Sequence, residues 1–307
     1  MKLNRIARAS TTVAAAAGAL ALVAGCTPGA AAAGGELEVF RIAYLPNEEA
    51  PHVIDARTSM QEGLEAALGL DVREYITTDY AAMVEAMRLE QVEMAFFGPL
   101  SFTRAYERAG AIPMAQFAPE GNPDLAEIRS IMVVRADSDI YSLDDIEGRT
   151  IAFVDPDSTT GTLLPSNAII EHFPDRDLDL HDLQTNGVLF DAVAFSGGHQ
   201  QSLNAVLMGD VEIAPISSRF LAAGIERGDF AEDYLRVIYA TDIVPGNTLA
   251  VRPGLPADLM ANLETFLMEF DDEVFFYGFQ GNPALRFFRT TLEDFQELIE
   301  LDRRLNS

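Results

Sequence analysis

Short apolar segments alternate with amphipathic ones along most of the chain, and this alternation restricts the folds that are open to it. The first series predicts strands at 39–45, 71–77, 93–98 and 112–118. Helical periodicity fills the intervals, near 52–68, 79–90 and 99–109. A strand–helix–strand order of this kind is typical of a largely parallel sheet that helices cover on both faces.

A second series of the same type follows. The segment 129–137 is expected to be a strand that leads out of the first sheet. Further strands are predicted at 150–155, 187–196, 211–217 and 234–241, with helices over 162–172, 200–208 and 218–227. The segment 244–256 is strand-like and bounded by proline and glycine, so it can return the chain to the first sheet. The remainder, 257–307, is expected to be mostly helical.

Two α/β lobes joined by two chain crossings form the architecture of a solute-binding protein, with the ligand held in the cleft. We expect residues 38–130 plus 247–307 to form the first lobe and 131–246 the second. The hinge is expected near 129–135 and 244–251. In open parallel sheets, ligands lie outside the carboxyl ends of the strands, where helices begin. The strand-to-helix turns are therefore the places at which to look for a site.

The amino terminus predicts export. Residues 1–25 have a basic start and then a small apolar run, the pattern of a signal peptide rather than of a fold element. They end in LVAG before Cys26, which resembles a bacterial lipobox and predicts lipidation of Cys26. The alternative is an ordinary secretory signal with a chance cysteine. As the only cysteine, Cys26 cannot form an intramolecular disulfide. Residues 26–37 are expected to be a flexible tether, with the protein on the outer face of the cytoplasmic membrane.

Charge excludes several classes of partner. The chain has 21 basic and 48 acidic residues, and its single lysine lies in the predicted signal peptide. So acidic a protein is not expected to bind nucleic acid or a membrane surface, apart from a lipid anchor. No second apolar run approaches the ~20 residues that span a bilayer. An anion site in such a chain must be built locally.

The stretch DPDSTTGTLLP, residues 155–165, is the first candidate for such a site. The hydroxyls of Ser158, Thr159 and Thr160 stand where a predicted strand turns into a helix, and Gly161 allows close approach of the backbone. Hydroxyls, free N–H groups and the positive end of a helix dipole together favour a small oxyanion. The alternative is a plain helix cap. The Lys of a P-loop is missing, so nucleotide hydrolysis is not expected.

Three further turns occupy similar positions. SGGHQQ places His199 at a helix start, FFGPLS places Ser101 there, and TTDYAA places Tyr80 there. Each has a structural alternative, as a capping, surface or core residue. No metal-binding His/carboxylate cluster, cofactor lysine or nucleophile–base pair is visible, so we expect neither a cofactor nor an enzyme.

These segments resemble the phosphate/phosphite/phosphonate-binding proteins of ABC importers. DPDSTTGTLLP, TDYAAMVEAMRLEQVEMAFFGPLS, SGGHQQSLNAVLMGDVEIAP and VIYATDIVPGNTLAVR match that family in order, over about residues 40–270. The resemblance implies a type II periplasmic-binding-protein fold and delivery of a phosphorus oxyanion to a permease with its ATPase. It also implies that Ser158, Thr159, Thr160 and His199 hold the phosphoryl group, and that Tyr80 lines the pocket.

The sequence departs from the family at positions that contact the part of the ligand beyond its phosphoryl group. The acidic residues that meet an ammonium group in aminoalkylphosphonate binders align near Ser217 and at Asn247, both neutral here, although the alignment near Ser217 can shift by a residue or two. Ile128 stands where a tyrosine is expected. A buried ammonium without a carboxylate costs several kcal/mol. We therefore expect phosphite, phosphate or methylphosphonate, held by neutral donors without a fixed counter-charge.

Two other functions stay open at this point. A lipoprotein of the same fold that senses its ligand for a signalling partner has the same sequence features. An enzyme on a related two-lobed fold is the less favoured alternative, because no catalytic group is visible. The protein is expected to act as a monomer.

Overall fold

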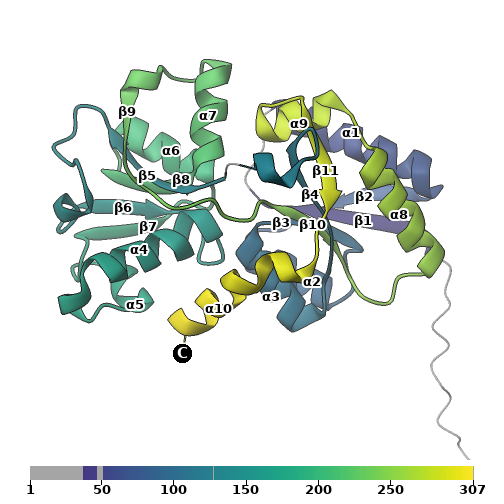
Figure 1. Ribbon diagram of the computed structural model, residues 1–307, viewed down its shortest axis with the longest axis horizontal. Coiled ribbons are helices and arrows are strands. Elements are labelled where there is room, and N and C mark those ends of the chain that lie inside the picture. Colours follow the sequence, from purple (N-terminus) through teal and green to yellow (C-terminus); the bar gives the residue numbers. More distant parts are fainter. Residues whose placement is uncertain (1–36, 47–50, 127, 307) are drawn as a thin grey trace, which may run out of the picture. The chain divides into compact units, whose positions relative to one another are not determined.

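The structure, a computed structural model, describes residues 37–46, 51–126 and 128–306. The predicted signal peptide, Cys26 and the tether up to residue 36 lie outside these residues. Within them, two mixed sheets with helices on their faces form two lobes (Figure 1).

The first sheet has six strands in the order β11-β4-β10-β3-β1-β2. β1 pairs in parallel with β2 and β3, whereas β10 pairs antiparallel with β3 and β4, and β11 pairs antiparallel with β4. The strands are β1 (Val39–Tyr44), β2 (Asp71–Tyr75), β3 (Met94–Phe97), β4 (Ile112–Pro119), β10 (Thr248–Val251) and β11 (Leu285–Arg289).

Helices cover both faces of this sheet, as the predicted alternation requires. On one face, Phe40 and Ile42 of β1 pack against α1, α8 and α9. On the other face, Ala43 of β1 lies in a cluster with α2, α3 and α10. The helices are α1 (Pro51–Leu68), α2 (Tyr80–Arg88), α3 (Pro99–Ala109), α8 (Ala257–Glu269), α9 (Glu273–Gln280) and α10 (Gln296–Leu305).

The second sheet has five strands in the order β7-β6-β8-β5-β9. β6 pairs in parallel with β7 and β8, and β5 pairs antiparallel with β8 and β9. One face packs on α4 and α5, the other on α6 and α7. The elements are β5 (Ser130–Arg135), β6 (Thr150–Phe153), β7 (Ala192–Phe195), β8 (Ile213–Ser217), β9 (Leu235–Ala240), α4 (Leu164–His172), α5 (Leu180–Leu183), α6 (His199–Met208) and α7 (Ser218–Arg227).

The described chain passes twice between the two sheets. After β4 of the first sheet it enters β5 of the second, and after β9 it returns to the first sheet at β10. The long strand predicted at 244–256 is limited to β10, because prolines and glycines flank it.

Two predicted elements differ from the structure. The strand expected over 187–196 is only β7, because Gly187 has a φ of +78° and starts a turn in which its N–H donates to the carbonyl of Phe190. Leu189 and Phe190 of that turn fill the core instead, whereas Val188 is exposed. The tail expected to be mostly helical contains β11, whose Leu285 and Phe287 point inward in alternation with Arg286.

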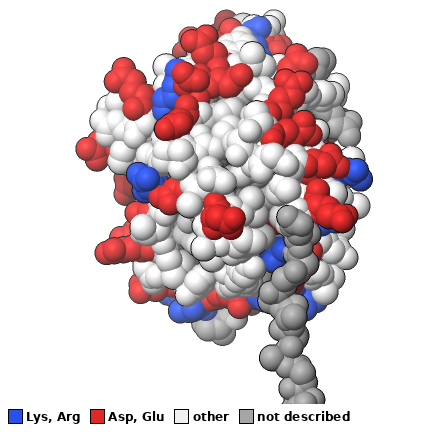
Figure 2. Space-filling view, turned by 90° about the vertical axis from the view of Figure 1, so that its right-hand side faces the viewer, with Lys and Arg blue, Asp and Glu red and all other residues white. Residues whose placement is uncertain are grey.

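The surface agrees with the acidic composition. Figure 2 shows one face of the molecule, on which acidic side chains are numerous and arginines few. Among the described residues, no helix combines the length and the apolar character that a membrane crossing needs.

Close packing of α1 against α9 generates a test of the first lobe. A Cβ on Gly278 of α9 would lie 2.3 Å from the carbonyl oxygen of His52 in α1, so Gly278→Ala must push the helices apart. We expect a loss of about 1–3 kcal/mol in the free energy of unfolding, measured by urea denaturation.

The matched control is Gly63→Ala in α1. Its new Cβ would meet side chains and no backbone: the edge of the Phe266 ring at 2.9 Å, which can rotate away, and the Phe270 ring at 3.4 Å. Because alanine favours a helix by about 1 kcal/mol over glycine, this variant should be neutral or more stable. Equal losses in both variants would contradict the packing described.

Candidate functional site

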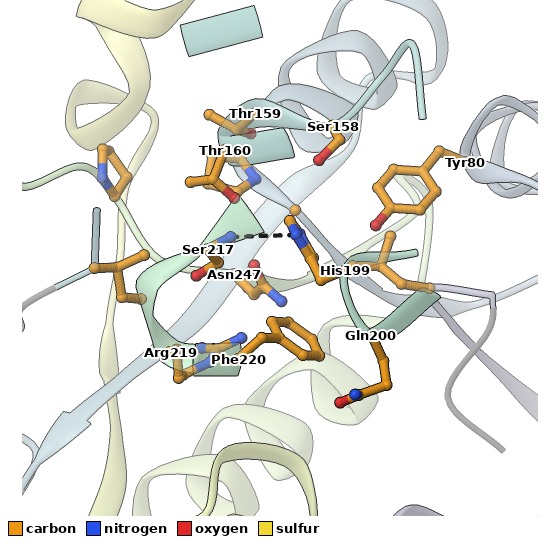
Figure 3. A pocket seen from close by; sticks show the side chains of 15 residues that line it. Tyr80, Ser158, Thr159, Thr160, His199, Gln200, Ser217, Arg219, Phe220 and Asn247 are labelled. Atoms are coloured by element: carbon orange, nitrogen blue, oxygen red, sulfur yellow. Dashed lines mark hydrogen bonds between the residues drawn. The ribbon is translucent and has the colours of Figure 1, made fainter. Parts of the chain in front are cut away.

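A pocket lies where the carboxyl ends of parallel strands from both sheets meet helix starts (Figure 3). About 30 Å³ inside it is open to the centre of a water molecule, enough room for a small ion and its contacts. It is lined by Leu45, Tyr80, Gly98, Pro99, Ile128, Ser158, Thr159, Thr160, His199, Gln200, Ser217, Arg219, Phe220, Pro245 and Asn247.

Seven of the eight predicted ligand-binding residues line this pocket, and Ser101 does not. Ser101 is fully buried in α3, and its hydroxyl donates to the carbonyl of Gly98 at 3.0 Å. Gly98 and Pro99, at the start of the same helix, do line the pocket. Helix α3 therefore faces the pocket with its first residues rather than with the serine.

The DPDSTTG turn presents its three hydroxyl residues from the end of β6. Ser158 is the N-cap of a π-helical turn, Thr159–Leu163, and its Oγ accepts the N–H of Gly161 at 3.2 Å. The Oγ1 of Thr159 accepts the N–H of Leu100 in α3 at 2.8 Å. This bond joins the turn of the second lobe to the first.

Close packing explains why residue 161 is a glycine, and the sequence alone did not indicate this packing. A Cβ at this position would lie 2.3 Å from Cγ2 of Val154, and the N–H of Val154 donates to the Gly161 carbonyl. The glycine therefore lets the turn fold back against the end of β6. The hydroxyls are held in place by backbone on both sides.

The two aspartates of the same stretch face the first lobe. Asp157 forms an ion pair with Arg104 of α3, which also contacts Asp302 of α10 at 3.3 Å. The carboxylate of Asp155 accepts the N–H of Asp157 at 2.8 Å and the backbone N–H of Tyr80. Burial still raises the pKa of Asp155 to about 6.

His199 is the first residue of α6 and is held by two neighbours. Its Nδ1 accepts the backbone N–H of Ser217 at 3.2 Å, and its ring stacks on Phe220 with centroids 4.7 Å apart. Burial and the charge of Arg219 lower the pKa of His199 to about 3. The ring is therefore neutral near pH 7, and because Nδ1 accepts, its proton is on Nε2.

Ser217 carries a buried hydroxyl for which the described residues offer no partner. The residue is 4% exposed, and its Oγ has no hydrogen bond among the described residues. Such a group costs about 1–3 kcal/mol when it stays unsatisfied. A ligand in the pocket is one way to satisfy it.

Arg219 is the residue that the sequence analysis missed. It is the second residue of α7, and its guanidinium carbon lies 5.4 Å from the centroid of the Phe117 ring and 5.9 Å from that of Phe220. The expectation that the site has no fixed positive charge is therefore wrong. Its position, two residues into a helix that follows a strand end, is the available sequence signal.

Among the residues that the structure describes, no acidic side chain lines the pocket. Ser217 and Asn247 both line the pocket as the alignment predicted, and Ile128 lies beside them. Figure 3 shows the hydroxyls of 158–160 on one side of the Ser217–His199 hydrogen bond and Arg219 on the other. The arrangement offers donors and one positive charge to an anion.

Metal binding finds no support in the described part of the chain. Within residues 37–46, 51–126 and 128–306, no three His, Cys, Asp or Glu side chains are grouped as a metal site requires.

Comparisons with known proteins agree with this geometry. Residues 42–293 match the family model described as the periplasmic substrate-binding protein of phosphonate ABC transporters. The phosphate-import protein PhnD of Mycolicibacterium smegmatis is 26% identical over 284 residues, which cover 88% of this chain and 87% of that protein.

Solved structures share the fold. PhnD1 from Prochlorococcus marinus in complex with methylphosphonate has a TM-score of 0.74 at 17% identity, over 88% of this chain and 98% of that one. A binding-protein component of a phosphonate ABC transporter from Pseudomonas aeruginosa has a TM-score of 0.75 at 19% identity, over 88% and 87%. The predicted two-lobed type II fold is thereby confirmed.

Ser217 supplies a test of the geometry of the free site. In Ser217→Ala the unsatisfied hydroxyl disappears, so the free energy of unfolding should stay unchanged or rise by about 1 kcal/mol. The control is Ser202→Ala, because the buried Ser202 hydroxyl contacts the Oγ of Ser196 at 2.6 Å and the carbonyl of Ala152 at 3.2 Å. Urea denaturation should show a loss of about 1–3 kcal/mol for this control. A similar loss for Ser217→Ala would mean that its hydroxyl has a partner.

Proposed function

Because the chain belongs to the family of periplasmic substrate-binding proteins of phosphonate ABC transporters, we propose that it captures a small phosphorus oxyanion without an amine. Phosphite, phosphate and methylphosphonate are the preferred ligands, ahead of aminoalkylphosphonates. One observation carries this proposal: Arg219 lines the pocket, and none of the lining residues within 37–46, 51–126 and 128–306 is an aspartate or a glutamate.

Electrostatics decides between these ligands. An ammonium group that enters this pocket loses its water and meets a guanidinium instead of a carboxylate. An oxyanion, in contrast, is stabilised in this pocket, because hydroxyls, helix starts and Arg219 all present positive or donating groups to it. Ser158, Thr159, Thr160 and His199 hold the phosphoryl oxygens in this proposal. Tyr80, Ser217 and Asn247 complete the wall.

Closure of the two lobes accompanies binding in this proposal. Residues 38–130 plus 247–307 form the first lobe and 131–246 the second, with hinges near 129–135 and 244–251. The bond from Leu100 to Thr159 and the ion pair from Arg104 to Asp157 support it, because both link α3 of the first lobe to the turn that binds the ligand. Ligand binding and lobe contact thus share one segment.

The protein acts outside the cytoplasmic membrane, as its family does. Binding proteins of ABC importers deliver a small ligand to a permease with its ATPase. We propose that lipid on Cys26 anchors this chain as a monomer and that the closed lobes present their surface to the permease. No step of this function requires catalysis.

A calorimetric panel of ligands tests the proposal. Phosphite, phosphate, methylphosphonate and 2-aminoethylphosphonate are titrated into the purified chain at pH 8. The amine-free ligands should bind at least tenfold more tightly than 2-aminoethylphosphonate, since an unpaired buried ammonium costs more than about 1.4 kcal/mol. Tighter binding of the amine ligand would overturn the proposed ligand class. Absence of binding by all four would overturn the function.

A further inference from the structure

We infer that the pocket selects the fully deprotonated form of its oxyanion, and that Arg219 sets this preference. The inference rests on the proposed function, because it takes the ligand to be a phosphorus oxyanion that can carry one acidic proton. It concerns which protonation state of that ligand binds.

Two hydroxyls of the DPDSTTG turn are oriented as donors. The Oγ of Ser158 accepts the N–H of Gly161, and the Oγ1 of Thr159 accepts the N–H of Leu100. No described residue accepts the proton of either hydroxyl. Both residues line the pocket and are at most 4% exposed. Each hydroxyl therefore has a proton to give to a ligand and a lone pair that is already in use.

His199 is a donor for the same reason. The N–H of Ser217 occupies its Nδ1, so the neutral ring carries its proton on Nε2. No described residue is hydrogen-bonded to Nε2. A neutral imidazole in this tautomer has no acceptor left for a ligand proton.

Arg219 adds the charge. A guanidinium has five donors and no acceptor, and it stays protonated at any pH of interest. The rings of Phe117 and Phe220 lie against it and support its position at the wall. A second negative charge on the ligand strengthens this interaction, whereas a proton on the ligand weakens it.

The described part of the lining contains only neutral acceptors. Tyr80, Thr160, Ser217 and Asn247 have oxygens that can accept, and none of the described residues that line the pocket is acidic. A ligand P–OH has to leave water and place its proton among groups that mostly donate. The monoanion therefore carries less charge and finds only neutral acceptors for its proton among these residues, and the dianion binds in preference.

An experiment on the pH dependence of binding must distinguish ionisation of the ligand from ionisation of protein groups near the pocket. Among the described residues, Tyr80, His199 and Arg219 line the pocket. Asp155 interacts with Asp79 and Arg104, and Arg104 pairs with Asp157. Asp155 is the group to separate, since its pKa is raised to about 6. Protein groups titrate at the same pH whichever ligand is used. The ligands differ, because the second ionisation of phosphite occurs at lower pH than that of methylphosphonate.

The test is calorimetry with phosphite and methylphosphonate between pH 5.5 and 9. For each ligand, affinity should rise by up to tenfold per pH unit and level off at the ligand's own second pKa, so the phosphite curve should level off first. Flat curves, falling curves, or curves that level off at one shared pH would overturn the inference. Failure of both ligands to bind at any pH would overturn the proposed function instead.

Variants of Arg219 test whether this residue sets the preference for the deprotonated ligand. Arg219→Gln should lose ten- to hundredfold in affinity at pH 9 and show a shallower rise with pH, because the dianion loses most. Arg219→Lys keeps the charge, so it should keep the steep rise even if affinity falls. Circular dichroism and urea denaturation establish that both variants are folded. An unchanged slope in a folded Arg219→Gln would show that Arg219 does not set the preference.

Discussion

Removal of an oxyanion from water is the constraint on which the rest of this structure depends. An anion gives up strong hydration when it is buried, and only directed donors can replace that hydration. The chain brings such donors together by ending parallel strands of two sheets at one place. Because each strand is followed by a helix, the same topology supplies capped turns, free N–H groups and the positive ends of helix dipoles. This local arrangement explains how a strongly acidic protein offers a site to an anion.

The DPDSTTG segment serves two purposes at once. Its hydroxyl residues line the pocket, while Asp155 and Asp157 contact Tyr80 and Arg104 of the first lobe. Gly161 lets the segment pack closely against Val154, next to the end of β6. A ligand that binds the hydroxyls therefore acts on a segment already joined to the other lobe. This is a physical basis for the coupling between binding and lobe closure that we propose.

The sequence predicted the strand-to-helix turns well, because turn residues, caps and periodicity are local properties. Seven of the eight expected site residues line the pocket for that reason. Arg219 was missed, since the direction of a side chain two residues into a helix depends on the packing of Phe117 and Phe220 around it. The proton position on His199 depends on a bond from Ser217, a contact that crosses 18 residues. The short strand β11 was missed among helices, because five residues with two arginines carry a weak strand signal.

A crystal structure of the protein grown with methylphosphonate would show whether the hydroxyl turn holds the ligand. We expect the phosphonate oxygens within hydrogen-bond distance of Ser158, Thr159 and the Nε2 of His199, with Arg219 within reach of the ligand. A phosphonate bound elsewhere, or bound here without contact to these hydroxyls, would contradict this expectation.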